Sequence, residues 1–515
     1  MIKFFLFVFL LFSSFQSRAV LLSDFCQENV VCSDGFVSAL SSAMKTNTPL
    51  IVKGNNYLIK NIDTENKGLH NISILGLGDS ARLKTNQLHL KDIPFLTIKN
   101  LKIEGLDYYE GSEEQSTSLV FVGTIKGTMI GNITFDNVTI SKAAEDLLAI
   151  WNTNNILIMN STLSQAGLAM RIAPILIPND LRPRGSGIAI KNIQNATFSR
   201  NKILATKKVG IYFSSYDFIS NNIVLSNNYI DLKSDTQPTQ RYGLLGGNGI
   251  YFDQTTSFDR VDIFGNNIRN YNTSAMRLNG KGFTVFDNQM NSFVNCPGSE
   301  EQVEPSIGAS GIKSHYLENS VIYSNCIENS LSGVNLESWG MISNISISTN
   351  KIFKSNSSIV VQYKAGGTYN HVKINDNEIY GALQNAIAFR ADHLVSGNSV
   401  LRNTIISGTQ WDGTDSRKGP LIYLQNQSNF QIKFNYLATT AYSKNWTHML
   451  FNNSSNGTFS DNIIMSITGD DHNFGGVTLY SNTSKINVLD NHFYLLLPGV
   501  LNESNENVIG HNSYH

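Results

Sequence analysis

Side chains that can carry out acid–base chemistry recur between residues 250 and 340, each at an equivalent place in a repeated five-residue motif. The motif is a small residue followed by two alternations of a mostly apolar and a variable position, as in "GIKSH" from Gly311 and "GVNLE" from Gly333. Its variable positions carry the candidate catalytic residues Asp253, Arg277, Lys313, His315 and Glu337. Two cations, an imidazole and two carboxylates are groups that proton transfer beside a sugar carboxylate requires.

The chemistry that this set favours is that of a polyuronate lyase or epimerase. Such an enzyme neutralises a sugar carboxylate, removes the proton beside it, and protonates the opposite face or the leaving oxygen. Arg277 and Lys313 would neutralise the carboxylate. Because neighbouring cations favour the neutral form of a lysine, Lys313 is the first candidate for the base and His315 the second. Tyr251 or Tyr212 would donate the proton.

Other variable positions of the same motif supply candidates for substrate binding. These are Tyr212, Tyr251, Asn279, Asn335 and Arg390. Charged residues gather at the centre of the series, whereas its ends carry mostly small, apolar or amide side chains. The alternative interpretation is a solvated sheet surface, on which opposite charges on neighbouring strands stabilise pairing by roughly a few tenths of a kcal/mol.

A second motif determines how these residues are arranged. It consists of a large apolar residue, two variable residues, an asparagine, one variable residue and another large residue. The motif recurs from Asn201 to Asn491, with Asn227 in its second copy and Asn325 between the two stretches quoted above. Successive asparagines are mostly 21 to 29 residues apart, and three longer steps of 37 to 39 residues leave room for a loop. The copies are rich in Ile, Val, Phe and Tyr with period-two alternation, which predicts short strands.

Short strands repeated at this spacing become stable when they stack as rungs about 4.8 Å apart. Asparagine tolerates the left-handed backbone of a tight turn, and its amide can bond the amide one rung away. Alternate residues then face inward and outward, so that Lys313, His315, Asn335 and Glu337 face outward. The predicted fold class is all-β, a right-handed parallel β-helix formed by one chain.

The N-terminal part fits the same architecture. Asp34 to Met44 reads as a short amphipathic helix that would cap the open end of the coil, and strands are expected at residues 50–53, 57–60 and 72–75. This helix, the stretches "TPLIVKGNNYLIKN" and "NISILGLGD", and the asparagine-cornered rungs resemble the pectate-lyase-like β-helix superfamily over nearly the whole mature chain. The resemblance implies the fold. It names no activity, because the superfamily includes polysaccharide lyases, glycoside hydrolases, epimerases, phage tailspikes and non-catalytic surface proteins.

The first residues have the composition of an export signal. Lys3 precedes a mostly apolar run, Phe4 to Phe15, and the small residues Ser17 and Ala19 suit a signal peptidase. A run of about twelve residues is too short to span a bilayer comfortably, although an uncleaved anchor is the alternative. No later stretch approaches 18 apolar residues. We therefore expect a secreted, periplasmic or cell-surface protein with no membrane span in the mature chain.

The expected domain organisation is simple. A signal peptide covers residues 1–19, and a single β-helix domain covers residues 20–515. Within that domain we expect an N-terminal cap with the first strands (20–60), stacked rungs (61–500) and a C-terminal tail (501–515).

The four cysteines fit an oxidising compartment. Their spacing suggests two local disulfides, Cys26–Cys32 and Cys296–Cys326, although four cysteines allow three pairings.

Composition and spacing bear on ligands as well. No cysteine or histidine spacing is typical of zinc, so the metal is unknown and no cofactor is established. Ca²⁺ stays open, because Asp470, Asp471 and His472 could hold a cation. The balance of 39 basic and 40 acidic residues predicts no nucleic-acid partner.

Long segments precede several of the strands that carry the catalytic motif. We expect them to rise as walls beside its outward face, at residues 164–186, 231–248, 291–310 and 403–420. A long polar surface between walls suits a polymer. Asp253 and Glu337 would lie three rungs apart, roughly 14 Å, whereas the carboxylates of a glycosidase lie about 5 to 9.5 Å apart. A hydrolase would therefore need a loop carboxylate, such as Asp180, Asp412 or Asp415.

The sequence thus predicts a secreted carbohydrate-active protein, a lyase or epimerase that acts on an acidic, uronate-containing polysaccharide. Two alternatives remain open: a non-catalytic adhesin or carbohydrate-binding surface protein, and a β-helix glycoside hydrolase. The expected partner is a polysaccharide, and both a monomer and a homotrimer are compatible with the sequence.

Overall fold

The structure is a computed structural model, and it describes most of the chain. The described residues are 19–54, 56–106, 118–167, 185–206, 208–216, 218–232, 247–253, 258–271, 273–292, 309–364, 366–407, 419–439, 447–466, 476–494, 496 and 499–515. Residues 1–18 of the predicted signal peptide and most of the four predicted wall segments lie outside these residues. The chain divides into two compact units, Met1–Lys202 and Ile203–His515.

The first unit begins with the predicted capping helix. After strand β1 (Val20–Leu21) and a 3-10 turn η1 (Leu22–Asp24), helix α2 covers Ser33–Thr46. Its buried residues Phe36, Ala39, Leu40 and Ala43 recur at helical spacing and form one apolar face. The helix ends at Asn47, whose left-handed backbone (φ 50°) lets its N–H bond the carbonyls of the last turn.

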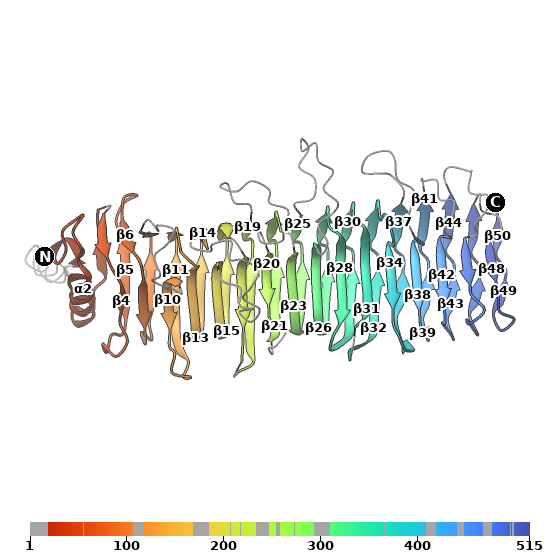
Figure 1. The fold of residues 1–515 in the computed structure, drawn as a ribbon, viewed down its shortest axis with the longest axis horizontal. Helices are drawn as coiled ribbons and strands as arrows, with labels where there is room; N and C mark the ends of the chain where they lie inside the picture. Colours follow the sequence, from red (N-terminus) through yellow and green to blue (C-terminus); the bar gives the residue numbers. More distant parts are fainter. Residues whose placement is uncertain are drawn as a thin grey trace, which may run out of the picture. The chain divides into compact units, whose positions relative to one another are not determined.

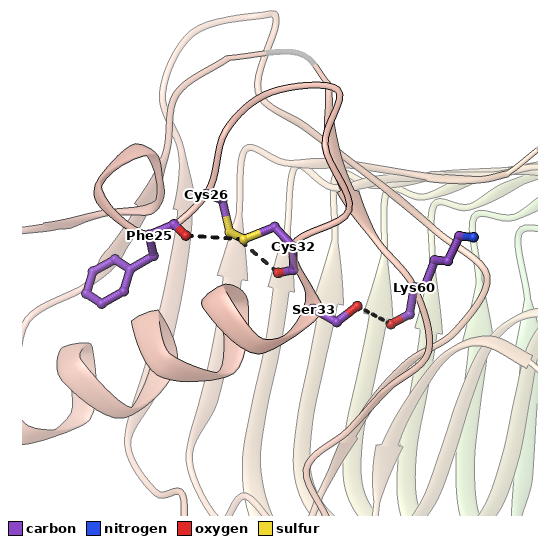
Figure 2. Close-up of a disulfide and its surroundings, with 5 residues drawn as sticks. All are labelled: Phe25, Cys26, Cys32, Ser33 and Lys60. Atoms are coloured by element: carbon purple, nitrogen blue, oxygen red, sulfur yellow. Dashed lines mark hydrogen bonds between the residues drawn. A yellow bond between two sulfur atoms is a disulfide. The ribbon is translucent and has the colours of Figure 1, made fainter.

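A disulfide holds the start of α2, as Figure 2 shows. Cys26 and Cys32 are bonded, which confirms the first predicted pair. Gly35 in the first turn lies so close that a Cβ there would come 2.3 Å from Sγ of Cys32, so the disulfide requires glycine at this position. The Ser33 hydroxyl donates a hydrogen bond to the Lys60 carbonyl at 2.6 Å, which ties the helix to the chain beyond the first strands.

The rest of the first unit consists of coils of three short parallel strands. The first sheet contains β4 (Ile62–Asp63), β7 (Leu88–Lys91), β10 (Ser118–Gly123) and the first parts of β13 (Asp146–Met159) and β15 (Ser186–Ser199). The second contains β1, β2 (Leu50–Val52), β5 (Ile72–Gly76), β8 (Leu96–Lys99), β11 (Ile130–Asp136) and the remainders of β13 and β15. The third contains β3 (Tyr57–Ile59), β6 (Arg82–Thr85), β9 (Lys102–Gly105), β12 (Thr139–Ser141) and β14 (Thr162–Ala166).

The second unit repeats the same three-stranded coil after β16 (Lys202–Thr206). Its first sheet, which carries the candidate site, contains β17 (Val209–Ser214), β20 (Asn248–Phe252), β23 (Ser274–Lys281), β26 (Ser310–Tyr323), β28 (Ser332–Ser338), β31 (Ser357–Tyr363), β34 (Ile387–Arg390), β38 (Ile422–Gln425), β42 (Met449–Asn452), β45 (Val477–Leu479) and β48 (Val500–Asn502). Figure 1 shows β23, β26, β28 and β31 following one another.

The other two sheets of the second unit complete each coil. The second contains β18 (Ser220–Ser226), β21 (Phe258–Phe264), β24 (Phe283–Phe286), part of β26, β29 (Met341–Ser348), β32 (Thr368–Asn375), β36 (Ser399–Leu401), β40 (Gln431–Lys433), β43 (Thr458–Ser460), β46 (Asn487–Leu489) and β49 (Val508–Gly510). The third contains β19 (Tyr229–Asp231), β22 (Asn267–Arg269), β25 (Gln289–Asn291), β27 (Cys326–Glu328), β30 (Lys351–Phe353), β33 (Glu378–Tyr380), β37 (Thr404–Ser407), β41 (Tyr436–Thr439), β44 (Ile463–Ser466), β47 (His492–Tyr494) and β50 (Ser513–Tyr514). A further short pair is formed by β35 (Val395–Ser396) and β39 (Gln427–Ser428).

Burial along the first sheet confirms the predicted alternation. In β28, Val334 and Leu336 are fully buried, and in β26 Ile312 and the small polar Ser314 are too. The small residue that opens each motif is required by packing: a Cβ at Gly311 would come 2.5 Å from the side chain of Ile327 in the third sheet. The motif therefore encodes both the inward core and the outward row.

An asparagine ladder runs through the corner between the second and third sheets of the second unit. The Nδ2 of each member donates to Oδ1 of the next at 2.9–3.0 Å. Its members are Asn228, Asn266, Asn288, Asn325, Asn350, Asn377, Asn403, Asn435, Asn462, Asn491 and Asn512. These bonds confirm that the amides pair between rungs.

Two details of the ladder differ from the sequence prediction. The left-handed residue is the one before each asparagine, such as Ser324 (φ 54°) and Thr349 (φ 52°), because the ladder amide itself must point into the coil. The second copy of the motif is also displaced by one residue. Asn228 joins the ladder, whereas Asn227 takes the left-handed position (φ 54°).

One further prediction is wrong. Residues 501–515 are no tail: β48, β49 and β50 add another rung, because their apolar residues continue the pairing of β45, β46 and β47. The predicted Cys296–Cys326 disulfide stays a prediction, because Cys296 lies outside the described residues. In the third sheet Cys326 pairs in register with Gln289 and Lys351.

Candidate functional site

The candidate catalytic residues meet on the outward side of the first sheet of the second unit. Strand register places Tyr251 beside Arg277, Arg277 beside Lys313, and Lys313 beside Asn335. Strands β20, β23, β26 and β28 are thus consecutive rungs, as the sequence predicts. Each outward residue is positioned by the apolar residues on either side of it, which are fixed in the core.

The Glu337 carboxylate is the centre of the cluster. Its Oε2 lies 3.1 Å from Nζ of Lys313 and 3.2 Å from Nε2 of His315. Its Oε1 accepts hydrogen bonds from Nδ2 of Asn335 at 3.1 Å and Nε2 of Gln362 at 3.2 Å. Burial opposes its ionisation, but the hydrogen bond from His315 and the charge of Lys313 outweigh burial and lower the pKa of Glu337 to about 2. This carboxylate is therefore an anion and no general acid at neutral pH.

His315 is held between a cation and this anion. Its Nδ1 lies 3.1 Å from a terminal guanidinium nitrogen of Arg277. Because a guanidinium can only donate, Nδ1 accepts, and the proton of the neutral ring is on Nε2, facing Glu337. Burial lowers the pKa of His315, the charges of Arg277 and Lys313 lower it further, and the bond to Glu337 opposes them. The result is a neutral imidazole of defined tautomer at physiological pH.

Two tyrosines and an aspartate continue the cluster on the other side of Arg277. The guanidinium carbon of Arg277 lies 4.9 Å from the ring centroid of Tyr251, a cation–π contact. The rings of Tyr251 and Tyr212 meet edge to face, with centroids 5.4 Å apart. The Tyr212 hydroxyl donates to Oδ2 of Asp253 at 2.7 Å. Burial raises the pKa of both phenols; the bond to Asp253 raises that of Tyr212 further, and Arg277 opposes the rise at Tyr251.

Asn279 does not face outward, so its prediction as a substrate-binding residue is wrong. The register between β23 and β26 shifts after Leu278, where an extra residue bulges in β26, and Asn279 is fully buried. Its Oδ1 accepts from the backbone N–H of His315 at 3.0 Å and of Tyr316 at 3.3 Å, and its Nδ2 donates to the Phe252 carbonyl at 2.7 Å. Asn279 thus satisfies the donors that the bulge leaves unpaired.

Asn335 and Arg390, which are also predicted to bind substrate, lie at different distances from the cluster. Asn335 belongs to the cluster through Glu337, but it is nearly buried. Arg390 follows Gln362 in the register, so it lies two rungs beyond Glu337, about 10 Å along the coil. Its guanidinium donates to Oδ1 of Asn385 at 2.8 Å. Arg390 is therefore placed to contact a neighbouring part of a long ligand.

Sequence reasoning missed two residues beside the cluster. Gln362 donates to both Glu337 and Asn335, and its place in the outward row was the available signal. Trp339 is 53% exposed, and its ring centroid lies 6.0 Å from that of His315. The only signal for Trp339 was an isolated tryptophan before Gly340, immediately after a strand.

The candidate cation-binding residues are separate from this cluster in the sequence. The stretch Asp470–His472 and the loop carboxylates Asp180, Asp412 and Asp415 lie outside the described residues. Within the described residues, no group of three His, Cys, Asp or Glu side chains is arranged to hold a metal ion.

Among the helices that the structure describes, none has the length and apolarity needed to cross a membrane.

Comparison with known proteins places the fold. Residues 50–296 match the family model described as the right handed beta helix region. None of the curated proteins matches the chain. Among solved structures, PfbA, a surface adhesin of Streptococcus pneumoniae, is 15% identical and covers 84% of this chain and 92% of its own, with a TM-score of 0.42.

Two other solved structures are similar at the same level. The Dettilon tailspike protein is 14% identical, with coverage of 96% of this chain and 67% of its own and a TM-score of 0.36. The catalytic unit of a GH87 α-1,3-glucanase from Streptomyces thermodiastaticus is 11% identical, with coverage of 79% and 65% and a TM-score of 0.40. At these identities and scores the likenesses carry no argument about activity. The stacked parallel coils and the family match together establish that the chain has a right-handed parallel β-helix fold.

Proposed function

We propose that the outward row of the second unit binds an acidic polysaccharide and removes the proton beside a uronate carboxylate, as a lyase or an epimerase. The observation that carries this proposal is the neutral His315 imidazole, held with Nδ1 toward Arg277 and Nε2 toward Glu337. A neutral imidazole beside two cations combines a base with groups that stabilise the anion formed when the proton leaves.

Substrate binding would expose the base. The sugar carboxylate is a stronger partner for the Arg277 guanidinium than a neutral ring nitrogen, because it is an anion and accepts two parallel hydrogen bonds. When Arg277 turns to the carboxylate, the Nδ1 lone pair of His315 is released. The ionised Glu337 then stabilises the imidazolium that proton abstraction produces.

The remaining steps follow from proton balance. In a lyase, Nδ1 takes the proton next to the carboxylate, the electrons of that C–H bond form the C4–C5 double bond, and the C4–O4 bond breaks. The leaving oxygen takes a proton from a phenol, for which Tyr251 is nearest to Arg277. In an epimerase, the carbanion is instead reprotonated on the opposite face.

The geometry changes the preferred base. Lys313 was the first candidate, but its Nζ is held 3.1 Å from Oε2 of Glu337 in an ion pair, whereas Nδ1 of His315 faces Arg277. We therefore assign Lys313, with Arg277, to the substrate carboxylate, and His315 to the proton.

A hydrolase is the weaker alternative, because Asp253 and Glu337 lie on rungs three apart, roughly 14 Å. A non-catalytic binding surface is the stronger one. It is favoured by the mutual pairing of Glu337 with Lys313, His315, Asn335 and Gln362, since such a network also stabilises the rungs.

An extracellular location is part of the proposal. A disulfide between Cys26 and Cys32 suits an oxidising compartment, in agreement with the export signal expected at residues 1–19.

The test is incubation with polygalacturonate, alginate and glucuronan in deuterated buffer. A lyase gives the ultraviolet absorbance of an unsaturated uronate, and an epimerase gives deuterium at the carbon beside the carboxylate. His315→Ala should abolish both signals. The control is Lys351→Ala, which removes an exposed ion pair of the third sheet with Glu378. Binding without product or exchange on every polymer would leave the non-catalytic surface as the function.

A further inference from the structure

An exposed aromatic residue adjoins the catalytic cluster at the end of β28. Trp339 is 53% exposed, and its ring is tilted 43° to that of His315 at a centroid separation of 6.0 Å. A large aromatic side chain left in water costs free energy that burial against a ligand would recover. At the end of β28, Trp339 therefore offers a contact to the sugar units of a ligand that extends beyond the proposed base.

Hydrogen bonds hold the backbone around Trp339 in place. Its N–H bonds the Glu337 carbonyl at 2.9 Å, and the next N–H, of Gly340, bonds the His315 carbonyl at 3.2 Å. A Cβ at Gly340 would come 3.2 Å from the Tyr316 ring, so the turn lies directly on the bulge of β26. The ring of Trp339 is thus presented in a defined place relative to His315.

Aromatic residues continue along the same edge on the next two rungs. Tyr363 ends β31 and pairs in register with Ser338, the residue before Trp339. Its ring meets that of the exposed His393 edge to face, with centroids 5.0 Å apart, just beyond β34. The Tyr363 hydroxyl accepts a bond from the Gly366 N–H at 3.2 Å, which holds the ring over its own turn. We define Trp339, Tyr363 and His393 as the aromatic edge.

We propose that the aromatic edge is a saccharide-binding platform, on which the sugar units next to the reacting uronate stack. This inference rests on the proposed function. The edge follows the stacking direction of the rungs, so a chain that enters at Arg277 and Glu337 extends over it. Sugar rings present C–H faces that pack on aromatic rings, whereas their hydroxyl and carboxylate edges remain in water.

Part of the aromatic edge carries positive charge, which suits an acidic polymer. Lys364 follows Tyr363 in the chain, and Arg390 precedes the turn that carries His393. Asp392 adjoins His393 and is exposed, so the charge there is mixed and stacking supplies the affinity.

The platform is tested by binding, independently of turnover. Hexamers and dimers of galacturonate, mannuronate and glucuronate are titrated by calorimetry and by tryptophan fluorescence. Dimers fit the cluster alone and hexamers also reach the edge. Trp339→Ala should weaken hexamer binding about tenfold, the equivalent of losing part of one buried aromatic contact, and should leave dimer binding unchanged. Trp339→Phe should retain most of the affinity.

The control is Phe95→Ala, which removes a comparably exposed aromatic side chain (49%) in the first unit. Equal hexamer affinity in Trp339→Ala and the unaltered protein would overturn the platform while leaving the catalytic proposal intact. Equal losses for dimer and hexamer would also overturn it, because they indicate a disturbed cluster. No binding of any oligouronate would overturn the platform together with the proposed function.

Discussion

Nε2 of His315 lies 3.2 Å from Oε2 of Glu337, and the two residues come from adjacent rungs of one parallel sheet. Arg277 donates to the other ring nitrogen, so the imidazole has a set tautomer and orientation. A carboxylate in this position does for a histidine base what the aspartate does in a serine protease triad: it orients the ring and stabilises its cation. The consequences for mutation and pH can be stated one by one.

Replacement of the carboxylate is expected to impair turnover more than binding. In Glu337→Gln the amide no longer stabilises the imidazolium, so kcat on the active polyuronate should fall about 10²-fold or more while KM changes little. Steady-state kinetics measure this split. Gln362→Ala, which removes only one hydrogen bond to Glu337, should retain most of kcat. A rise in KM at unchanged kcat would contradict the role assigned to the carboxylate.

The pH dependence of kcat/KM should follow the ionisation of His315. Because burial and the neighbouring cations lower the pKa of His315 below 6.5, the free enzyme holds the base unprotonated at neutral pH. We expect kcat/KM to rise with pH through an acidic limb below pH 6.5 and to be level near pH 7. In Glu337→Gln the carboxylate that raises this pKa is lost, so the limb should move to lower pH. A limb that stays in place would mean that another group titrates.

Asn279 is expected to act as a positioning residue. Asn279→Ala leaves the N–H groups of His315 and Tyr316 without their acceptor, and the bulge loses the bond to the Phe252 carbonyl. This should lower kcat about tenfold or more and shift the acidic limb of the pH profile. Asn279→Asp keeps the acceptor and should recover part of the rate. A loss of stability with an unchanged pH profile would indicate a structural role alone.

Acid should weaken the fold through Glu337. Its pKa is lowered from 4.5 to about 2 in the folded state, so the stabilisation is fully present above pH 4.5 and disappears as pH falls through about 2. With allowance for solvent screening, about 2 kcal/mol is at stake. Urea midpoints of the unaltered protein and Glu337→Gln should therefore converge between pH 4.5 and 2. Glu378→Gln, at an exposed ion pair, serves as the control and should follow the unaltered protein.

The asparagine ladder should contribute strongly to stability. Asn350 is fully buried, donates to the Ile322 carbonyl and to Asn377, and accepts from Asn325. Asn350→Ala leaves several buried groups unpaired and should cost about 2–4 kcal/mol in the free energy of unfolding. Denaturant titration measures it. Asn267→Ala, which removes a more exposed bond to Gln289, should cost under about 0.5 kcal/mol. Similar losses in the free energy of unfolding for the two variants would show that a ladder asparagine stabilises the fold no more than an exposed one.

Much of the fold follows from local patterns in the chain. Apolar alternation and the recurring asparagine determine that Ile312 and Val334 enter the core while Lys313 and Asn335 face outward, because burial leaves one register for each rung. The order of strands β20, β23, β26 and β28 follows in the same way, since each rung pairs with the next. For this reason the residue pattern alone is enough to place the candidate residues on one surface.

The fine geometry of the site depends on contacts between rungs that no local pattern records. The sequence carries no mark of the bulge at His315, which accompanies the burial of Asn279 and places the imidazole beside Arg277. A bulge arises when one strand has an extra residue relative to its neighbour, so it depends on two distant segments at once. Local residue patterns therefore suffice to predict the coil and its outward row. Which side chains in that row touch depends on hydrogen bonds across rungs, because these bonds set the side-chain directions.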